Sequence, residues 1–139
     1  MSKKKVFVFG VFDGFHEGHR NFLAQAKRLG EYLVVVVAHD EAVTQLKGRA
    51  PRLSLAERML DVEKEDSVDE VVEGDAVQGS WEVLKTHQPS VIALGYDQEA
   101  MRQELEKNKD RFRFSVILYT TKAYQPQRYS SRLPFPRKK

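Results

Sequence analysis

The sequence predicts an α/β protein with a doubly wound, mostly parallel five-stranded sheet and helices on both faces. Short runs rich in β-branched and aromatic residues alternate with segments whose apolar residues recur at helical spacing. The run at 32–38 (YLVVVVA) has no polar alternation, which is typical of a strand that is covered on both faces. Strands and helices that alternate with short connections favour a parallel sheet between two helical layers.

Five segments have the composition of strands. The first run, at 5–11 (KVFVFGV), is β-branched and aromatic, and the fourth, at 90–94 (SVIAL), is apolar along its length. The predicted strands are 5–11, 32–38, 68–72, 90–94 and 112–119.

Five segments are predicted to be helices. The first has apolar residues at helical spacing and is followed by Gly30, a typical residue after a helix end. Ser54 and Glu57 have the spacing of a capping box at the start of the third. The predicted helices are 17–29, 40–46, 54–64, 81–87 and 98–108.

Length and composition limit the classes of function. The 139 residues fit one domain, 1–139, whose core needs no disulfide. The absence of cysteine excludes disulfides, iron–sulfur clusters, thiolate zinc sites and cysteine nucleophiles. The longest apolar run is too short to span a membrane, and residues 1–5 lack the apolar segment of a signal peptide. We therefore expect a cytoplasmic protein with no membrane partner.

The net charge of +3 comes from the two ends of the chain. Without the basic residues at 3–5 and 137–139, the remaining 17 Lys and Arg are outnumbered by 20 Asp and Glu. A nucleic-acid-binding protein usually carries a basic stripe on the fold itself. We interpret 1–4 and 134–139 as short basic tails and do not expect a nucleic-acid partner, although an RNA-binding module that uses these ends stays an alternative.

The residues best suited to chemistry follow the first predicted strand. The stretch 10–19 (GVFDGFHEGH) opens a helix, and the backbone N–H groups at a helix start favour a phosphate. Gly18 lets the backbone approach a ligand closely. His16 and His19 can donate hydrogen bonds to phosphate oxygens while charge builds up on them. A metal-binding pair and ordinary surface histidines are the alternatives, and no third ligand lies near them in the sequence.

This stretch resembles the G-x-F-D-x-x-H-x-G-H signature of the cytidylyltransferase-like nucleotidyltransferases. The resemblance extends over residues 4–131. It implies a Rossmann-like fold and an enzyme that transfers a nucleoside monophosphate from ATP or CTP to a phosphate-bearing small molecule, with release of pyrophosphate. It also implies Mg²⁺ as cofactor, in-line displacement without a covalent enzyme intermediate, and a homodimer.

The resemblance implies roles for individual residues. His16 and His19 would contact the triphosphate and stabilise the transition state, and Lys47 would reach phosphates. Asp13 would lie at the metal or the triphosphate. The other implied nucleotide-binding residues are Val11, Phe12, Gly18, Gly95, Asp97, Arg128, Ser130 and Ser131.

Two further stretches resemble the archaeal-type FAD synthases, which are FMN adenylyltransferases. These are 38–43 (AHDEAV) followed by 47–51 (KGRAP), and 94–98 (LGYDQ). This resemblance implies ATP as donor and FMN as acceptor. Glycerol-3-phosphate cytidylyltransferases share the first motif, and the domains that make ADP-heptose share the Lys-Gly pair, so a cytidylyltransferase of the glycerol-3-phosphate type stays the alternative.

The chain departs from the family pattern at three places. Val11 stands where many members have Thr or Ser, and Arg132 replaces the last hydroxyl of an I-S-S-T stretch. Pro134 and Pro136 prevent a final helix. These departures keep open a non-catalytic nucleotide-binding paralogue. We expect base choice to depend on 95–98 and 119–124, and the acceptor pocket to involve the loops at 39–53 and 119–132.

Four other polar or aromatic residues have structural interpretations. Asp97 is a favoured residue type for the N-cap of the helix from Gln98, in addition to a ligand contact, and Asp40 would cap its own short helix. Arg58 would belong to a surface ion pair, and Trp81 would pack against the core or a helix.

Overall fold

The computed structural model describes residues 3–76 and 79–122 of the chain. Five strands in this part form one sheet in the order β3-β2-β1-β4-β5, and every neighbouring pair is parallel. The prediction of a doubly wound, five-stranded sheet is therefore confirmed. The strands are β1 (Lys5–Gly10), β2 (Tyr32–Val37), β3 (Glu70–Glu73), β4 (Val91–Leu94) and β5 (Ile117–Thr120).

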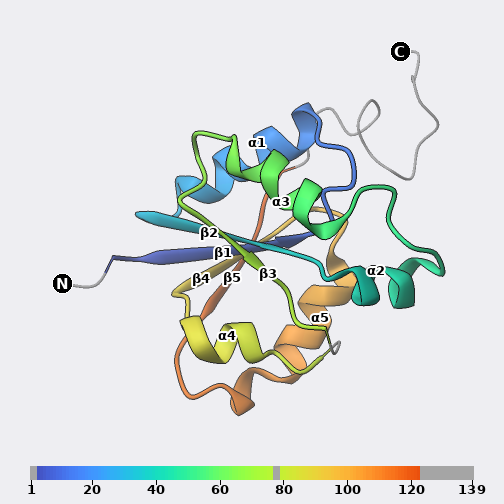
Figure 1. Cartoon of the computed structure of the whole chain (residues 1–139). Helices are drawn as coiled ribbons and strands as arrows, with labels where there is room; N and C mark the ends of the chain where they lie inside the picture. Colours follow the sequence, from blue (N-terminus) through green and yellow to red (C-terminus); the bar gives the residue numbers. More distant parts are fainter. Residues whose placement is uncertain (1–2, 77–78, 123–139) are drawn as a thin grey trace.

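Helices cover both faces of the sheet. Figure 1 shows α1 and α3 above it, α4 and α5 below it, and α2 beyond the ends of the strands. Among residues 3–76 and 79–122, none of the helices has the length and apolar character that a membrane crossing requires. The helices are α1 (Glu17–Lys27), α2 (Asp40–Lys47), α3 (Leu55–Glu63), α4 (Glu82–His87), α5 (Glu99–Lys107) and the short 3-10 helix η1 (Lys109–Arg111).

Two apolar clusters, one on each face of the sheet, form the core. Successive residues of β1 point to opposite faces, so Val6 and Val8 belong to the cluster under α1 and α3, while Phe7 and Phe9 belong to the other. All four side chains are buried. This burial on both faces explains why β1 and β2 carry continuous apolar runs.

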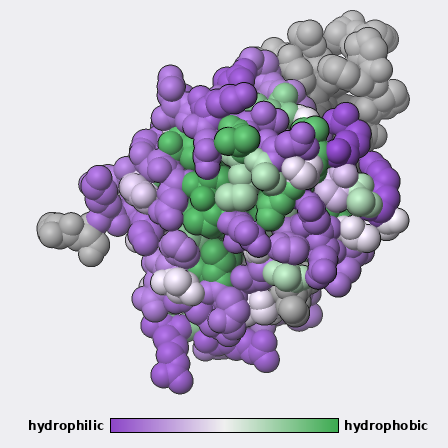
Figure 2. Space-filling model, viewed as in Figure 1, coloured by the Kyte–Doolittle hydropathy of each residue, from purple (hydrophilic) through white to green (hydrophobic). Residues whose placement is uncertain are grey.

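β3 is an edge strand of the sheet and faces the viewer in Figures 1 and 2. Figure 2 shows apolar residues in the middle of this face, surrounded by hydrophilic ones. The strand begins at Glu70 rather than at the predicted position 68. Before it, the Asp69 carboxylate accepts the backbone N–H of Leu33 at 2.8 Å, so a side chain makes this contact.

β5 is shorter than predicted, since it begins at Ile117 and not at 112. After α5 the chain forms η1, and the rings of Phe112 and Phe114 then stack with their centroids 5.6 Å apart. Both rings pack in the cluster between the sheet and α4–α5. The alternation of apolar residues in this stretch therefore reports burial, while strand pairing starts only at Ile117.

Candidate active site

A cavity of about 410 Å³ opens where β1 and β4 end. The strand order reverses between these two strands, and open parallel sheets bind ligands at such a point. The cavity is lined by the loop after β1, the start of α1, the end of α2 and the loop after β4. Nine of the residues singled out in the sequence line it: Val11, Phe12, Asp13, His16, Gly18, His19, Lys47, Gly95 and Asp97. Arg128, Ser130 and Ser131 lie outside the described residues.

His16 and His19 together form the N-terminal cap of α1. The Nδ1 atom of His16 accepts the backbone N–H of Gly18 at 3.0 Å. The Nδ1 atom of His19 accepts the backbone N–H of His16 at 3.2 Å. These reciprocal bonds are the same capping box that Ser54 and Glu57 form at the start of α3.

The capping box determines which nitrogen of each imidazole carries the proton. Because Nδ1 is an acceptor in both His16 and His19, the neutral ring is protonated at Nε2. Burial, together with the nearby His16 ring, lowers the pKa of His19 to about 4. Burial also lowers the pKa of His16, against the opposing charge of Glu17. At neutral pH the cavity is therefore bordered by two uncharged imidazoles with Nε2–H donors.

Aromatic packing holds the two imidazoles in place. Their rings stack on each other with centroids 3.9 Å apart, and Phe12 approaches His19 edge-on at 5.2 Å. Phe12 is buried and has a φ of 56°, a backbone conformation that bulky residues rarely adopt. A Cβ at Gly10 would lie 2.6 Å from the Phe12 ring, so this arrangement requires glycine there.

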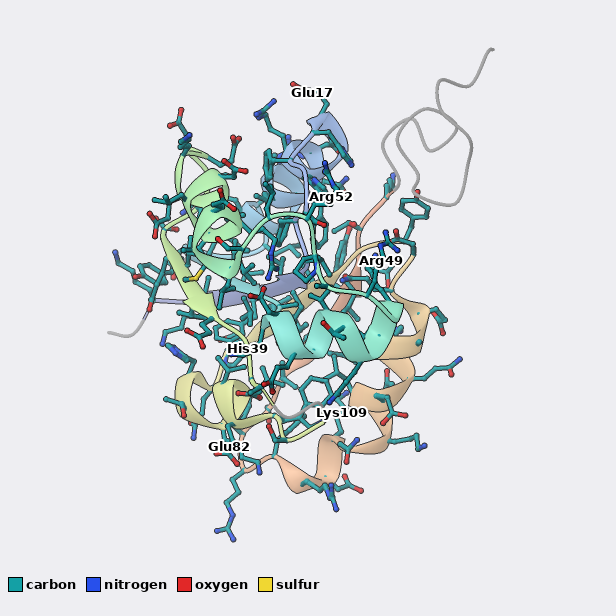
Figure 3. All side chains as sticks on the ribbon, turned by 45° about the vertical axis from the view of Figure 1, so that its right-hand side comes forward. Glu17, His39, Arg49, Arg52, Glu82 and Lys109 are labelled. Atoms are coloured by element: carbon teal, nitrogen blue, oxygen red, sulfur yellow. The ribbon has the colours of Figure 1, made fainter. Side chains whose placement is uncertain are left out.

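Asp13 joins the loop after β1 to the segment before α3. Its carboxylate accepts the backbone N–H groups of Arg52 at 2.8 Å and Leu53 at 2.9 Å. Figure 3 shows the loop labelled at Arg49 and Arg52 running toward the start of α1, labelled at Glu17. Partial burial raises the pKa of Asp13, but the two backbone donors and nearby arginines outweigh it and hold the pKa below its ordinary value.

Asp13 is also the side chain that the resemblance places at a metal. Within the described ranges, 3–76 and 79–122, no three His, Asp or Glu side chains are grouped to hold a metal ion. One ionised carboxylate at this cavity does suit Mg²⁺, which commonly uses one or two carboxylates, substrate phosphates and water. The donor set therefore fits an ion that enters with a nucleotide.

Arg58 is completely buried, and the prediction of a surface ion pair was wrong. Its guanidinium donates to the carbonyl oxygens of Leu53 at 3.0 Å, Val11 at 2.9 Å and Ala38 at 2.9 Å. A further bond reaches the Asp40 carboxylate. One side chain thus ties the ends of β1 and β2 to α2 and to the segment before α3.

The caps of α2 and α5 also differ from the predictions. His39, not Asp40, is the N-cap of α2, since its Nδ1 atom accepts the backbone N–H of Glu41 at 3.2 Å. Asp40 faces the buried Arg58 instead. The N-cap of α5 is Gln98, not Asp97, so the capping role predicted for Asp97 was wrong.

Gln98 was expected only as part of the stretch 95–98, without a role of its own, yet it connects the two strand ends that border the cavity. Its Oε1 atom accepts the N–H of Gly95, and its Nε2 atom donates to the carbonyl of Phe9, both at 2.8 Å. Its position in the short loop between a predicted strand and the next helix was the signal that would have identified it.

Lys122 is a second residue that the sequence analysis did not single out. It lines the cavity, and its backbone is bonded to Gln25 of α1 in both directions, at 2.8 and 2.9 Å. Thr121, immediately before it, donates its backbone N–H to the carbonyl of Leu94 at 2.8 Å. The end of β5 thereby adds a cation to the cavity, within the stretch 119–124 expected to affect base choice.

Comparison with known proteins gives one family and several close relatives. The family model described as cytidylyltransferase-like matches residues 7–133. FAD synthase from Thermococcus sibiricus is 44% identical over 130 residues, which cover 88% of each chain. FAD synthase from Pyrococcus horikoshii is 43% identical over 105 residues, 76% of this chain and 71% of the relative.

Solved structures share the fold. A protein from Thermoplasma volcanium titled as a lipopolysaccharide core biosynthesis protein superposes with a TM-score of 0.81 at 29% identity. The match covers 89% of this chain and 100% of that one. Pantoate-beta-alanine ligase from Francisella tularensis has a TM-score of 0.58 at 13% identity, with 88% and 61% covered, and shows the fold alone.

Proposed function

Because the chain belongs to the cytidylyltransferase-like family, we propose that this nucleotidyltransferase is an FMN adenylyltransferase, or FAD synthase. It would use ATP as donor and FMN as acceptor, and it would release pyrophosphate and FAD. The match to FAD synthases over most of both chains carries this proposal. The cavity lined by the Gly10–His19 segment, Lys47 and Gly95 would be the site of this reaction.

The chemical step is a direct displacement at phosphorus. An oxygen of the FMN phosphate attacks the α-phosphorus of ATP and forms a new P–O bond. The bond from that phosphorus to the bridging oxygen breaks, and its electron pair leaves with pyrophosphate. Such a transfer requires mainly positioning of the two phosphates and stabilisation of the charge that develops on their oxygens.

The residues at the start of α1 are suited to this stabilisation. His16 and His19 would donate Nε2–H bonds to phosphate oxygens, and their Nδ1 bonds to the backbone would keep both rings oriented. The positive end of the helix dipole favours an anion at the same place. A neutral imidazole is a much weaker acid than an imidazolium, so it donates these bonds without losing its proton to a phosphate oxygen.

Two lysines border the same cavity and would supply positive charge. Lys47 is the last residue of α2, where Gly48 ends the helix with a φ of 77°. Lys122 approaches from the end of β5. We propose that both contact the triphosphate, and that Arg128, Ser130 and Ser131 add contacts as the family resemblance implies.

Mg²⁺ would be held by nucleotide phosphates with Asp13 as the nearest carboxylate. Bound there, the ion would neutralise charge on the triphosphate and help pyrophosphate to leave. Asp13 would keep its two backbone donors and bind the ion directly or through water. We also propose that the protein is a homodimer, which light scattering of the purified chain would test.

Pyrophosphate release tests the proposed function directly. The full chain with Mg²⁺ is given ATP or CTP, each crossed with FMN, glycerol 3-phosphate and a heptose 1-phosphate. We expect release with ATP and FMN, and a product with the mass of FAD. Release only with CTP and glycerol 3-phosphate would overturn the proposal in favour of a cytidylyltransferase, and tight nucleotide binding with no release in any combination would favour a non-catalytic paralogue.

A further inference from the structure

A second cavity, of about 660 Å³, adjoins the first one. It lies between α2, residues 74–75 and 79–83, and α5, and Figure 3 shows α2 crossing the molecule above α4 and α5, with His39 labelled near its start. Phe9, Gly10, Val11 and Gln98 line both cavities. The two cavities therefore lie side by side against the same four residues.

Apolar side chains make up most of the wall of the second cavity. They come from β2, α2, the start of α4 and α5, and include Val36, Ala42, Leu46, Trp81, Val83 and Met101. Pockets of a few hundred cubic ångströms with such a lining suit a flat, largely apolar ring system better than a small polyol phosphate.

The polar groups of this wall are already bonded within the protein. Both carboxylate oxygens of Asp75 accept backbone N–H groups at the start of α4, from Glu82 at 2.9 Å and Val83 at 3.2 Å. His39 bonds the start of α2 through Nδ1, and its Nε2 atom lies 3.5 Å from the Glu73 carboxylate. The cavity is therefore more apolar in character than its residue types suggest.

Trp81 occupies a strained position at this wall. Its φ is 56° and its ψ is 30°, in the left-handed region that a bulky residue rarely adopts. It is the N-cap of α4 but makes no side-chain cap bond, because an indole has no acceptor, and the Asp75 carboxylate accepts the N–H of Glu82 instead. The indole packs edge-on against Phe9, with centroids 6.2 Å apart. Strained backbone of this kind is concentrated at ligand sites.

We propose that the second cavity binds the isoalloxazine ring of the flavin acceptor, with Trp81 as its aromatic contact. The ribityl phosphate would then extend across Gly10, Val11 and Gln98 into the first cavity. The two reacting phosphates would meet where the cavities join. This inference rests on the proposed function, which supplies FMN as the acceptor.

Flavin binding to the full chain tests the inference without turnover. The protein is titrated into a solution of FMN and, separately, of riboflavin, and the fluorescence of the flavin is followed. An indole in contact with an isoalloxazine quenches flavin emission by electron transfer. In Trp81→Gly the indole is lost, while glycine is at ease at the positive φ. We expect about a tenfold weaker affinity for both flavins and loss of the quenching, with ATP affinity unchanged within twofold.

A second variant guards against a folding defect in Trp81→Gly. Ala100 lies on the exposed side of α5 and lines the cavity, so Ala100→Glu places a charge there without disturbing the core. We expect the same loss of flavin affinity. The matched control is Leu60→Glu on α3, an exposed apolar residue that lines neither cavity, and it should bind flavin and ATP as the parent does.

The outcomes separate this inference from the proposed function. Unchanged flavin affinity in both cavity variants would overturn the ring site even if the parent makes FAD. Flavin binding that depends on Trp81, with no FAD formed, would support the ring site and overturn the proposed activity. No flavin binding by the parent protein would overturn both.

Discussion

His19 accepts the backbone N–H of His16 through Nδ1, and the two imidazole rings stack with their centroids 3.9 Å apart. His16 uses its own Nδ1 atom in the same way, toward Gly18. Each ring thus stabilises the start of α1 with one nitrogen and keeps Nε2–H as its donor. Helix capping and the proposed phosphate binding are performed by different atoms of the same side chains, and substitutions can separate them.

Replacement of His16 by asparagine separates capping from phosphate binding. Asparagine is a favoured N-cap residue, so His16→Asn retains an acceptor for the helix start but loses the Nε2–H donor. We expect turnover to fall about a hundredfold while the free energy of unfolding changes by less than about 0.5 kcal/mol. His16→Ala should lose both, at a further cost of about 1 kcal/mol in stability. Turnover and urea denaturation measure the two effects, and parental turnover in His16→Asn would refute the donor role.

His19 should titrate well below an ordinary histidine. Its pKa is lowered to about 4 by burial and by His16, whereas in the unfolded chain it is about 6.5. Between these two values the unfolded chain binds the proton that the folded protein rejects, so this residue's contribution makes stability fall as the pH drops from about 6.5 to about 4. Protonation at Nδ1 would also break the bond from the His16 backbone.

The titration of His19 is measured by NMR of its imidazole nitrogens. We expect an Nε2–H tautomer at pH 7 and a midpoint near 4. The variant His19→Asn should show less loss of stability over the same pH range, since it lacks the titrating ring. A midpoint above 6, or an Nδ1–H tautomer at pH 7, would contradict the capping-box geometry.

Replacement of the buried Arg58 should lower the stability of the protein strongly. Its removal by Arg58→Met leaves the carbonyls of Val11 and Ala38 without their donor and Asp40 without its cation. The Asp40 side chain is 48% exposed and can be solvated, so the main cost comes from the carbonyls, at about 1–3 kcal/mol for a buried polar group left without a partner. Urea denaturation should show a loss of at least about 2 kcal/mol even with partial relaxation. The exposed Arg111→Met is the matched control, and an equal, small effect in both would exclude the anchoring role.

Much of this fold follows from periodicity in the sequence. The runs in β1 and β2 are apolar on both faces because helices cover both, and the structure buries them as expected. The capping box of Ser54 and Glu57 marked the start of α3 correctly, because it depends only on local spacing. The alternation of apolar residues at 112–119 predicted correctly which side chains are buried, but it predicted strand pairing too early in the chain. Side-chain alternation does not specify which residues have backbone hydrogen-bond partners in the sheet.

The site was harder to predict where a residue's role depends on distant partners. Arg58 lies on the apolar stripe of α3 with Leu55 and Val62, and this was the one signal that it is buried. Its carbonyl partners come from three other segments, which no local pattern reveals. Gln98 and Lys122 likewise gain their positions from the edge of the sheet where strands meet.

Substitution of Lys47 and of Arg49 tests whether Lys47 contacts a phosphate or only adds positive charge near the cavity. Lys47 lines the first cavity, whereas Arg49, two residues later, does not. Both are exposed, so replacement by alanine should leave the fold intact. We expect Lys47→Ala to weaken ATP binding or turnover about tenfold or more, and Arg49→Ala to change both by less than twofold. Equal effects, measured at two salt concentrations, would indicate that only the local charge matters.

Gln98 provides a test of the joint between the two cavities. The substitution Gln98→Glu retains an acceptor for the N–H of Gly95. It replaces the amide donor to the Phe9 carbonyl by a carboxylate oxygen, which repels that carbonyl. We expect a loss of about 1–3 kcal/mol in stability at pH 7 and weaker binding of both substrates.

This loss in Gln98→Glu should depend on pH. A protonated carboxyl can donate to the Phe9 carbonyl as the amide does, so the pKa of the new group is raised in the folded protein. The deficit relative to the parent should therefore shrink as the pH falls from the raised pKa toward about 4.3, the ordinary value for glutamate, and should be smallest below that value. Urea denaturation at pH 7 and pH 4 measures it, with Gln103→Glu, exposed on the same helix, as control. A deficit equal at both pH values would mean that the bond to Phe9 does not hold the two strand ends together.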